Sequence, residues 1–116
     1  MDDAAIERLK AIAHPARFSI LNALRAGETN VGEIEAATGI TQPGLSQQLS
    51  VLRHAGLVST RREAKLVFYT LDGAVLAELT QAISSLVPEE TQASAAKASG
   101  PHASGHGAAV FAKIQR

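Results

Sequence analysis

The segment of residues 41–71 restricts the fold more than any other part of the chain. Its first half carries three leucines at the spacing i, i+4, i+7, which predicts a helix with one apolar face that runs through residue 54 or 55. These leucines are Leu45, Leu49 and Leu52. Two extended runs follow at 57–61 and 66–71, joined by residues 62–65, a pattern typical of a β-hairpin. We therefore expect a helix followed directly by a hairpin.

Apolar spacing together with proline and glycine positions predicts three shorter helices before this segment. They are expected at residues 2–12, 15–26 and 31–38. His14 ends the first helix because a residue before proline is pushed out of the α region, and Pro15 suits the first turn of the second. The apolar stripe of this second helix is expected to be Phe18, Leu21 and Leu24, with Ile20 beside it. Asn30, with Glu33 three residues later, predicts a capped start for the third helix, and Thr41 is expected to cap the fourth.

A last helix is predicted over residues 73–87, and Pro88 ends it. From there the chain is rich in alanine, serine and glycine and has no sustained apolar period. We therefore expect one folded domain over residues 1–88 and a flexible tail over residues 89–116. The expected fold class is mainly α with a small β-hairpin, in the order α-α-α-α-β-β-α.

The composition excludes several classes of protein. The chain has no cysteine, which removes disulfide scaffolds, cysteine-ligated zinc sites and thiol chemistry. No apolar run approaches the ~20 residues that span a bilayer, and the acidic start Met1-Asp2-Asp3 is unlike a signal peptide. We expect a cytoplasmic protein without a membrane partner. No nucleophile–base arrangement or phosphate-binding glycine loop is found either, so we expect neither an enzyme nor a cofactor.

The formal net charge is zero, but the charges are segregated along the chain. Residues 1–40 hold four basic and six acidic side chains, whereas residues 41–66 hold four basic side chains and one acidic. A short positive block of this kind favours contact with nucleic acid, although a solvated polar surface is the ordinary alternative.

The three-helix unit with a polar outer side on its last helix, followed by a hairpin with a cationic tip, indicates a winged helix-turn-helix. Amide and hydroxyl side chains suit base edges, and the arginines and lysine suit phosphates. The predicted base contacts are Gln42, Pro43, Gly44, Ser46, Gln47 and Ser50. The predicted backbone contacts are Thr41, Arg53, Arg61, Arg62 and Lys65. The alternative is a winged-helix adaptor that binds proteins and not DNA, but an adaptor has no need of the wing cations.

The first and last helices carry apolar stripes that exceed what one three-helix core covers. The predicted interface residues are Ile6, Leu9, Leu76, Leu79, Ile83 and Leu86. Pairing of two chains about a two-fold axis would bury them and place two recognition helices about one DNA turn apart, ~34 Å. In the alternative, the two stripes cover each other within a monomer.

Residues 6–87, about seventy per cent of the chain, resemble the ArsR-type (ArsR/SmtB) family of small bacterial winged-helix repressors. The matching stretches are residues 9–17 (LKAIAHPAR), 31–34 (VGEI), 42–58 (QPGLSQQLSVLRHAGLV), 61–62 (RR) and 67–71 (VFYTL). Their ordered series is more specific than any one of them. The resemblance implies a homodimer that binds a pseudo-palindromic operator in double-stranded DNA and is released when an inducer binds.

The inducer chemistry of the family does not carry over. The recognition stretch is most similar to the branch that senses persulfides through two cysteines, and Asn22 and Pro88 stand at those positions. Arsenic sensors have thiols where this chain has residues 30–32. The zinc-ligand positions of other members correspond to Gly73, Val75, Leu86 and Glu89. The resemblance therefore implies a repressor with an unidentified effector.

Two histidines in the tail, His102 and His106, offer a metal-responsive alternative, because imidazole is a common ligand of nickel, copper and zinc. Their i, i+4 spacing does not preset a common face, since Gly105 and Gly107 disfavour a helix there. We therefore expect no metal site.

Overall fold

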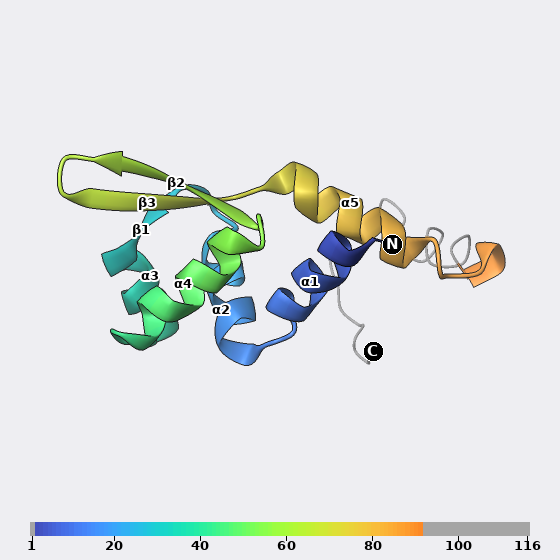
Figure 1. The fold of residues 1–116 in the computed structure, drawn as a ribbon, viewed down its shortest axis with the longest axis horizontal. Helices are drawn as coiled ribbons and strands as arrows, with labels where there is room; N and C mark the ends of the chain where they lie inside the picture. Colours follow the sequence, from blue (N-terminus) through green and yellow to red (C-terminus); the bar gives the residue numbers. More distant parts are fainter. Residues whose placement is uncertain (1, 92–116) are drawn as a thin grey trace, which may run out of the picture. The chain divides into compact units, whose positions relative to one another are not determined.

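The computed structural model describes residues 2–91 of the chain (Figure 1). It divides into two units, residues 1–82 and residues 83–116. The helices of the first unit are α1 (Asp3–Ile12), α2 (Pro15–Ala23), α3 (Val31–Thr38), α4 (Gly44–His54) and most of α5 (Gly73–Ser84). Its strands are β1 (Thr29–Asn30), β2 (Val58–Glu63) and β3 (Leu66–Leu71). The predicted fold class, mainly helical with a small hairpin, is confirmed.

Local signals set the starts of the first three helices. The Asp2 carboxylate accepts a hydrogen bond of 2.8 Å from the Ala5 N–H at the start of α1. Pro15 occupies the first turn of α2, as predicted. The capping box of α3 is present, because Asn30 Oδ1 accepts from the Glu33 N–H at 2.9 Å and Glu33 Oε1 accepts from the Asn30 N–H at 3.1 Å.

The sheet has three antiparallel strands in the order β1-β3-β2. The hairpin β2–β3 was expected, but β2 is longer than the predicted run and ends at Glu63, so that only Ala64 and Lys65 form the turn. Strand β1 was not expected. It has two residues and pairs with β3, Thr29 opposite Tyr69 and Asn30 opposite Phe68. So short a strand has no period of its own and is defined by its partner.

The core lies between α2, α3, α4 and the start of the hairpin. The predicted leucine face of α4 is confirmed, since its three leucines are fully buried. The other fully buried large side chains are Ile20, Leu24, Ile34 and Leu57. Phe18 is a correction: it was expected in the core stripe of α2 but is 58% exposed. The face buried by α2 is centred on Ile20 and Leu21, and Phe18 lies roughly 110° around the helix from it.

Helix α5 ends at Ser84, before the predicted end at residue 87. Of the second unit the structure describes residues 83–91, and the tail that was predicted from residue 89 therefore lies largely outside the described residues, His102 and His106 included. None of the helices between residues 2 and 91 combines the length and the apolar composition that crossing a membrane needs.

Candidate nucleic-acid interface

The first turn of α4 is capped by a glutamine. Thr41 was expected to be the N-cap, and this is wrong: the helix begins at Gly44, and the preceding Pro43 makes no side-chain capping bond. Gln42 supplies the missing acceptor, because its Oε1 accepts from the Ser46 N–H at 3.0 Å and from the Ser46 hydroxyl at 2.7 Å. An amide oxygen thus satisfies one of the free N–H groups of the helix start.

The structure brings the predicted base-contacting residues together on the side of α4 away from its buried leucines. All of them are exposed except Gly44, which is half-buried. A Cβ built on Gly44 would meet no protein atom within 4 Å, so the backbone is open to an approaching molecule there. The start of α4 therefore presents polar groups and bare backbone on one rigid surface.

Two arginines hold α4 in place, and sequence reasoning missed both roles. Arg8 of α1 donates from Nε to the Ala55 carbonyl, just after α4, at 3.0 Å. Arg17 of α2 donates from Nη1 to Gln48 Oε1 at 2.9 Å and from Nε to the Ala11 carbonyl at 2.6 Å. Arg8 lies 47 residues from Ala55 in the sequence, and Arg17 lies 31 residues from Gln48. No local sequence pattern therefore indicates these contacts. They link the recognition helix to the first two helices.

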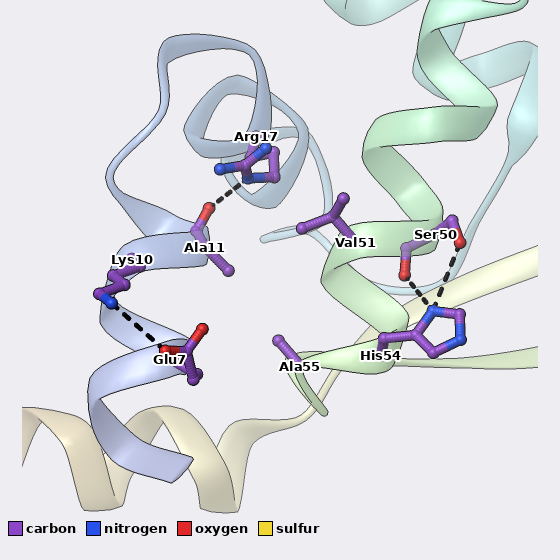
Figure 2. Close-up of a pocket in the computed structure, with 8 residues that line it drawn as sticks. All are labelled: Glu7, Lys10, Ala11, Arg17, Ser50, Val51, His54 and Ala55. Carbon is purple, nitrogen blue, oxygen red and sulfur yellow. Dashed lines mark hydrogen bonds and ion pairs between the residues drawn. The ribbon is translucent and has the colours of Figure 1, made fainter. Parts of the chain in front are cut away.

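A pocket of about 540 Å³ lies between α1, the start of α2 and the second half of α4 (Figure 2). Figure 2 shows Ser50 and His54 on its α4 wall, where His54 Nδ1 lies 2.8 Å from the Ser50 carbonyl oxygen and 3.4 Å from its hydroxyl. On the α1 wall, Lys10 pairs with Glu7 at 3.3 Å. The two charged side chains on that wall thus largely neutralise each other.

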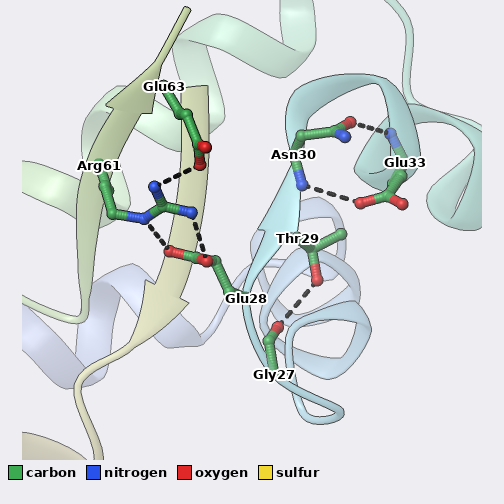
Figure 3. Close-up of polar contacts among 7 residues, drawn as sticks. All are labelled: Gly27, Glu28, Thr29, Asn30, Glu33, Arg61 and Glu63. Carbon is green, nitrogen blue, oxygen red and sulfur yellow. Dashed lines mark hydrogen bonds and ion pairs between the residues drawn. The ribbon is translucent and has the colours of Figure 1, made fainter. Parts of the chain in front are cut away.

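The wing is fastened to the loop before β1 through Arg61 (Figure 3). Its guanidinium donates two hydrogen bonds of 2.8 Å to the Glu28 carboxylate and one of 2.7 Å to Glu63. It also lies over the ring of Phe68, its partner across the hairpin, at 4.8 Å from the ring centre. The hydrogen bonds from Arg61 lower the pKa of Glu28, and the two carboxylates raise the pKa of Arg61. Arg61 is thus already paired within the chain.

The other cations of the predicted DNA-facing surface are differently placed. Arg53, Arg62 and Lys65 are exposed, and no acidic group between residues 2 and 91 pairs with them. The prediction that Arg61 contacts the DNA backbone remains a prediction, but a phosphate would have to compete with two carboxylates there. Glu28 was not singled out from the sequence, because it lies 33 residues from its partner.

The predicted dimer residues fall into two groups. Leu79 is buried within the single chain, and Leu9 and Leu76 pack partly against the core. Ile6, Ile83 and Leu86 retain apolar surface, with exposed fractions of 40%, 46% and 78%. Within residues 2–91 there is no group of three side chains suited to holding a metal ion.

The chain matches the family model described as "Bacterial regulatory protein, arsR family" over residues 14–60. It is 52% identical over 84 residues to the biofilm growth-associated repressor of Agrobacterium fabrum, covering 71% of this chain and 72% of that protein. It is 39% identical over 88 residues to the transcriptional activator HlyU of Vibrio cholerae, covering 76% and 82%. Among solved structures, the transcriptional repressor BigR from Xylella fastidiosa superposes with a TM-score of 0.59 at 44% identity, covering 72% and 85%.

Proposed function

The chain belongs to the ArsR family of bacterial regulatory proteins and is a DNA-binding transcriptional repressor, not an enzyme, and from this membership we propose that it binds its operator as a homodimer. An effector, still unidentified, releases the dimer from double-stranded operator DNA. A regulator of bacterial promoters works where the chromosome lies, so the proposal places it in the cytoplasm.

One observation carries the proposal: the exposed polar face of α4 is rigidly held. Its opposite face is buried by three leucines, and Arg8 and Arg17 tie its far end and its middle to α1 and α2. A recognition helix needs this support, because hydrogen bonds to base edges tolerate little movement of the donors and acceptors.

We assign the contacts on this face as follows. The start of α4 enters the major groove, and its residues contact base edges. These residues are Gln42, Pro43, Gly44, Ser46, Gln47 and Ser50. Thr41, Arg53, Arg62 and Lys65 contact phosphates, the last two from the wing. Arg61 reaches a phosphate only if it releases Glu28, and its main role here is to position the wing.

For the homodimer, Ile6, Ile83 and Leu86 supply the exposed apolar surface that a second copy would cover. A two-fold axis places the two α4 helices about one turn of DNA apart, ~34 Å. Replacing Ile83 with Glu should shift the protein to monomers in sedimentation analysis and weaken operator binding, whereas an exposed polar neighbour such as Gln81 replaced with Glu should change neither.

The test of the proposed function is binding of the purified protein to its own upstream region, compared with a scrambled duplex of equal length over a series of salt concentrations. We expect tighter binding to the upstream region and an affinity that falls with salt for both. Protein that shows no salt-sensitive affinity for any duplex would contradict the proposal. A panel of metals, sulfur species and small hydrophobic molecules, each assayed for release of the bound duplex, then searches for the effector.

A further inference from the structure

We propose that Gln42 reads DNA only as a hydrogen-bond donor, while Gln47 is the glutamine that pairs with adenine. The inference rests on the proposed function, because it assumes that the start of α4 faces base edges. It concerns a detail which membership of the family does not fix, namely which base each glutamine selects. The hydrogen bonds at the start of α4 carry the argument.

The orientation of the Gln42 amide follows from its partners. A backbone N–H can only donate, so the Gln42 atom 3.0 Å from the Ser46 nitrogen must be the oxygen. The Ser46 hydroxyl lies 2.7 Å from the same oxygen and donates to it as well. An amide oxygen has two lone pairs, and both are therefore used.

The amide of Gln42 is left with its two N–H donors and no free acceptor. Turning the oxygen toward DNA would orphan the Ser46 N–H, and Pro43 provides no side-chain cap in its place. The Ser46 hydroxyl donates its only hydrogen bond to Gln42, so toward DNA it can act only as an acceptor. The side chain of Gln47 makes no hydrogen bond with any residue of the described part of the chain, and it keeps both its donor and its acceptor.

These hydrogen-bonding roles predict different bases opposite Gln42 and Gln47. A free glutamine pairs with adenine through two bonds, donating to N7 and accepting from the N6 amino group. Gln42 could donate to adenine N7 but has no acceptor for the adenine amino group, so it would make only one of these two bonds and set a donor against a donor. Guanine offers two acceptors in the major groove, N7 and O6, and thymine offers O4. We therefore expect guanine or thymine opposite Gln42, and adenine opposite Gln47.

The test is selection of bound duplexes from a randomised pool by the wild type, Gln42→Glu and Gln47→Glu. The Gln42→Glu substitution keeps an oxygen for Ser46 and exchanges the donor for an acceptor, so it should switch one position per half-site from guanine or thymine to cytosine or adenine. Gln47→Glu is the matched control, because it makes the same change of charge at a side chain that takes no part in the cap, and it should alter a different position. Discrimination at the altered position should change about tenfold.

A second measurement changes the DNA base and uses Gln42→Glu only as the control. Replacing the selected guanine with 7-deazaguanine removes the N7 acceptor, and wild-type affinity should fall about tenfold if N7 is the contact and stay unchanged for Gln42→Glu. Adenine selected by the wild type at the position that Gln42→Glu alters would overturn the proposal, as would a Gln42→Glu variant that alters no position. A wild type that selects no sequence at all would instead refute the proposed function.

Discussion

The two adjacent arginines of β2 should differ in how they affect DNA binding, although a charge count treats them alike. Arg61 is held by Glu28 and Glu63, whereas Arg62 has no acidic partner in the described part of the chain. Replacing Arg62 with Gln should remove a phosphate contact. Replacing Arg61 with Gln should remove a charge that two carboxylates already neutralise.

The size of the effect follows from counterion release. Each phosphate contact contributes about 0.9 to the slope of log K against log salt concentration. A homodimer has two wings, so Arg62→Gln should flatten the slope by about 1.8. Between about 50 and 200 mM salt, this corresponds to a change of roughly twelvefold in the ratio of wild-type to variant affinity. Arg61→Gln should leave the slope within about 0.5 of the wild type.

Fluorescence anisotropy of a labelled operator duplex over a salt series measures these slopes. Glu28→Gln is the matched control: it removes one of the two carboxylates that hold Arg61 and leaves the wing itself unchanged, and the slope should then steepen if the loosened guanidinium reaches a phosphate. Equal flattening by Arg61→Gln and Arg62→Gln would refute the reasoning, because it would mean that Arg61 gives up its carboxylates for DNA.

Three further predictions concern the fold and the close approach of DNA. Leu49→Ala should destabilise the protein by about 2–5 kcal/mol in denaturant unfolding, because Leu49 is fully buried, and a cost below about 1 kcal/mol would show that the α4 face is not packed as described. Gly44→Ala should preserve or raise the melting temperature, since a Cβ meets no protein atom and alanine favours a helix by about 0.5–1 kcal/mol, yet it should weaken operator binding; unchanged affinity would place the DNA away from this backbone. The pKa of Glu28 is lowered in the folded protein, so its pairing with Arg61 stabilises the fold above the ordinary carboxyl value of 4.5 and is lost as pH falls through the lower folded value. The melting temperatures of wild type and Glu28→Gln should accordingly differ by a constant amount from about pH 8 to about pH 5 and converge in more acidic solution, and a difference that closes already at about pH 6 would contradict this assignment.

Features with local causes could be predicted from the sequence. The capping box at Asn30 and the proline at the start of α2 depend on residues within one helical turn, and both are confirmed. The leucine face of α4 follows from a spacing of i, i+4, i+7, and burial bears it out. The stripe expected for α2 used the spacing i, i+3, i+6 instead, which drifts around the helix, and Phe18 accordingly lies outside the core.

Features with distant causes could not be predicted in this way. Strand β1 exists because β3, much further along the chain, supplies Phe68 and Tyr69 as its partners. The cap of α4 comes from a glutamine two residues before the helix, whereas threonine, which stands at position 41, is the more usual capping residue. The clamps from Arg8 and Arg17 join residues from separate helices, so the sequence indicated their charge but not their role.

The charge on the wing shows why the unpaired cations of the site could not be identified from the sequence alone. The positive block of residues 41–66 owes its excess to four cations against one acid, but Glu28 lies outside that block and folds back onto Arg61. The paired guanidinium then fastens the wing, because it joins β2 to the loop before β1. Of the four cations in the positive block, those left without an acidic partner in the described part of the chain are Arg53 on α4 and Arg62 and Lys65 near the hairpin turn. Because counterion release counts only cations that reach phosphates, we expect the wing to contribute to DNA binding through Arg62 and Lys65 and not through Arg61.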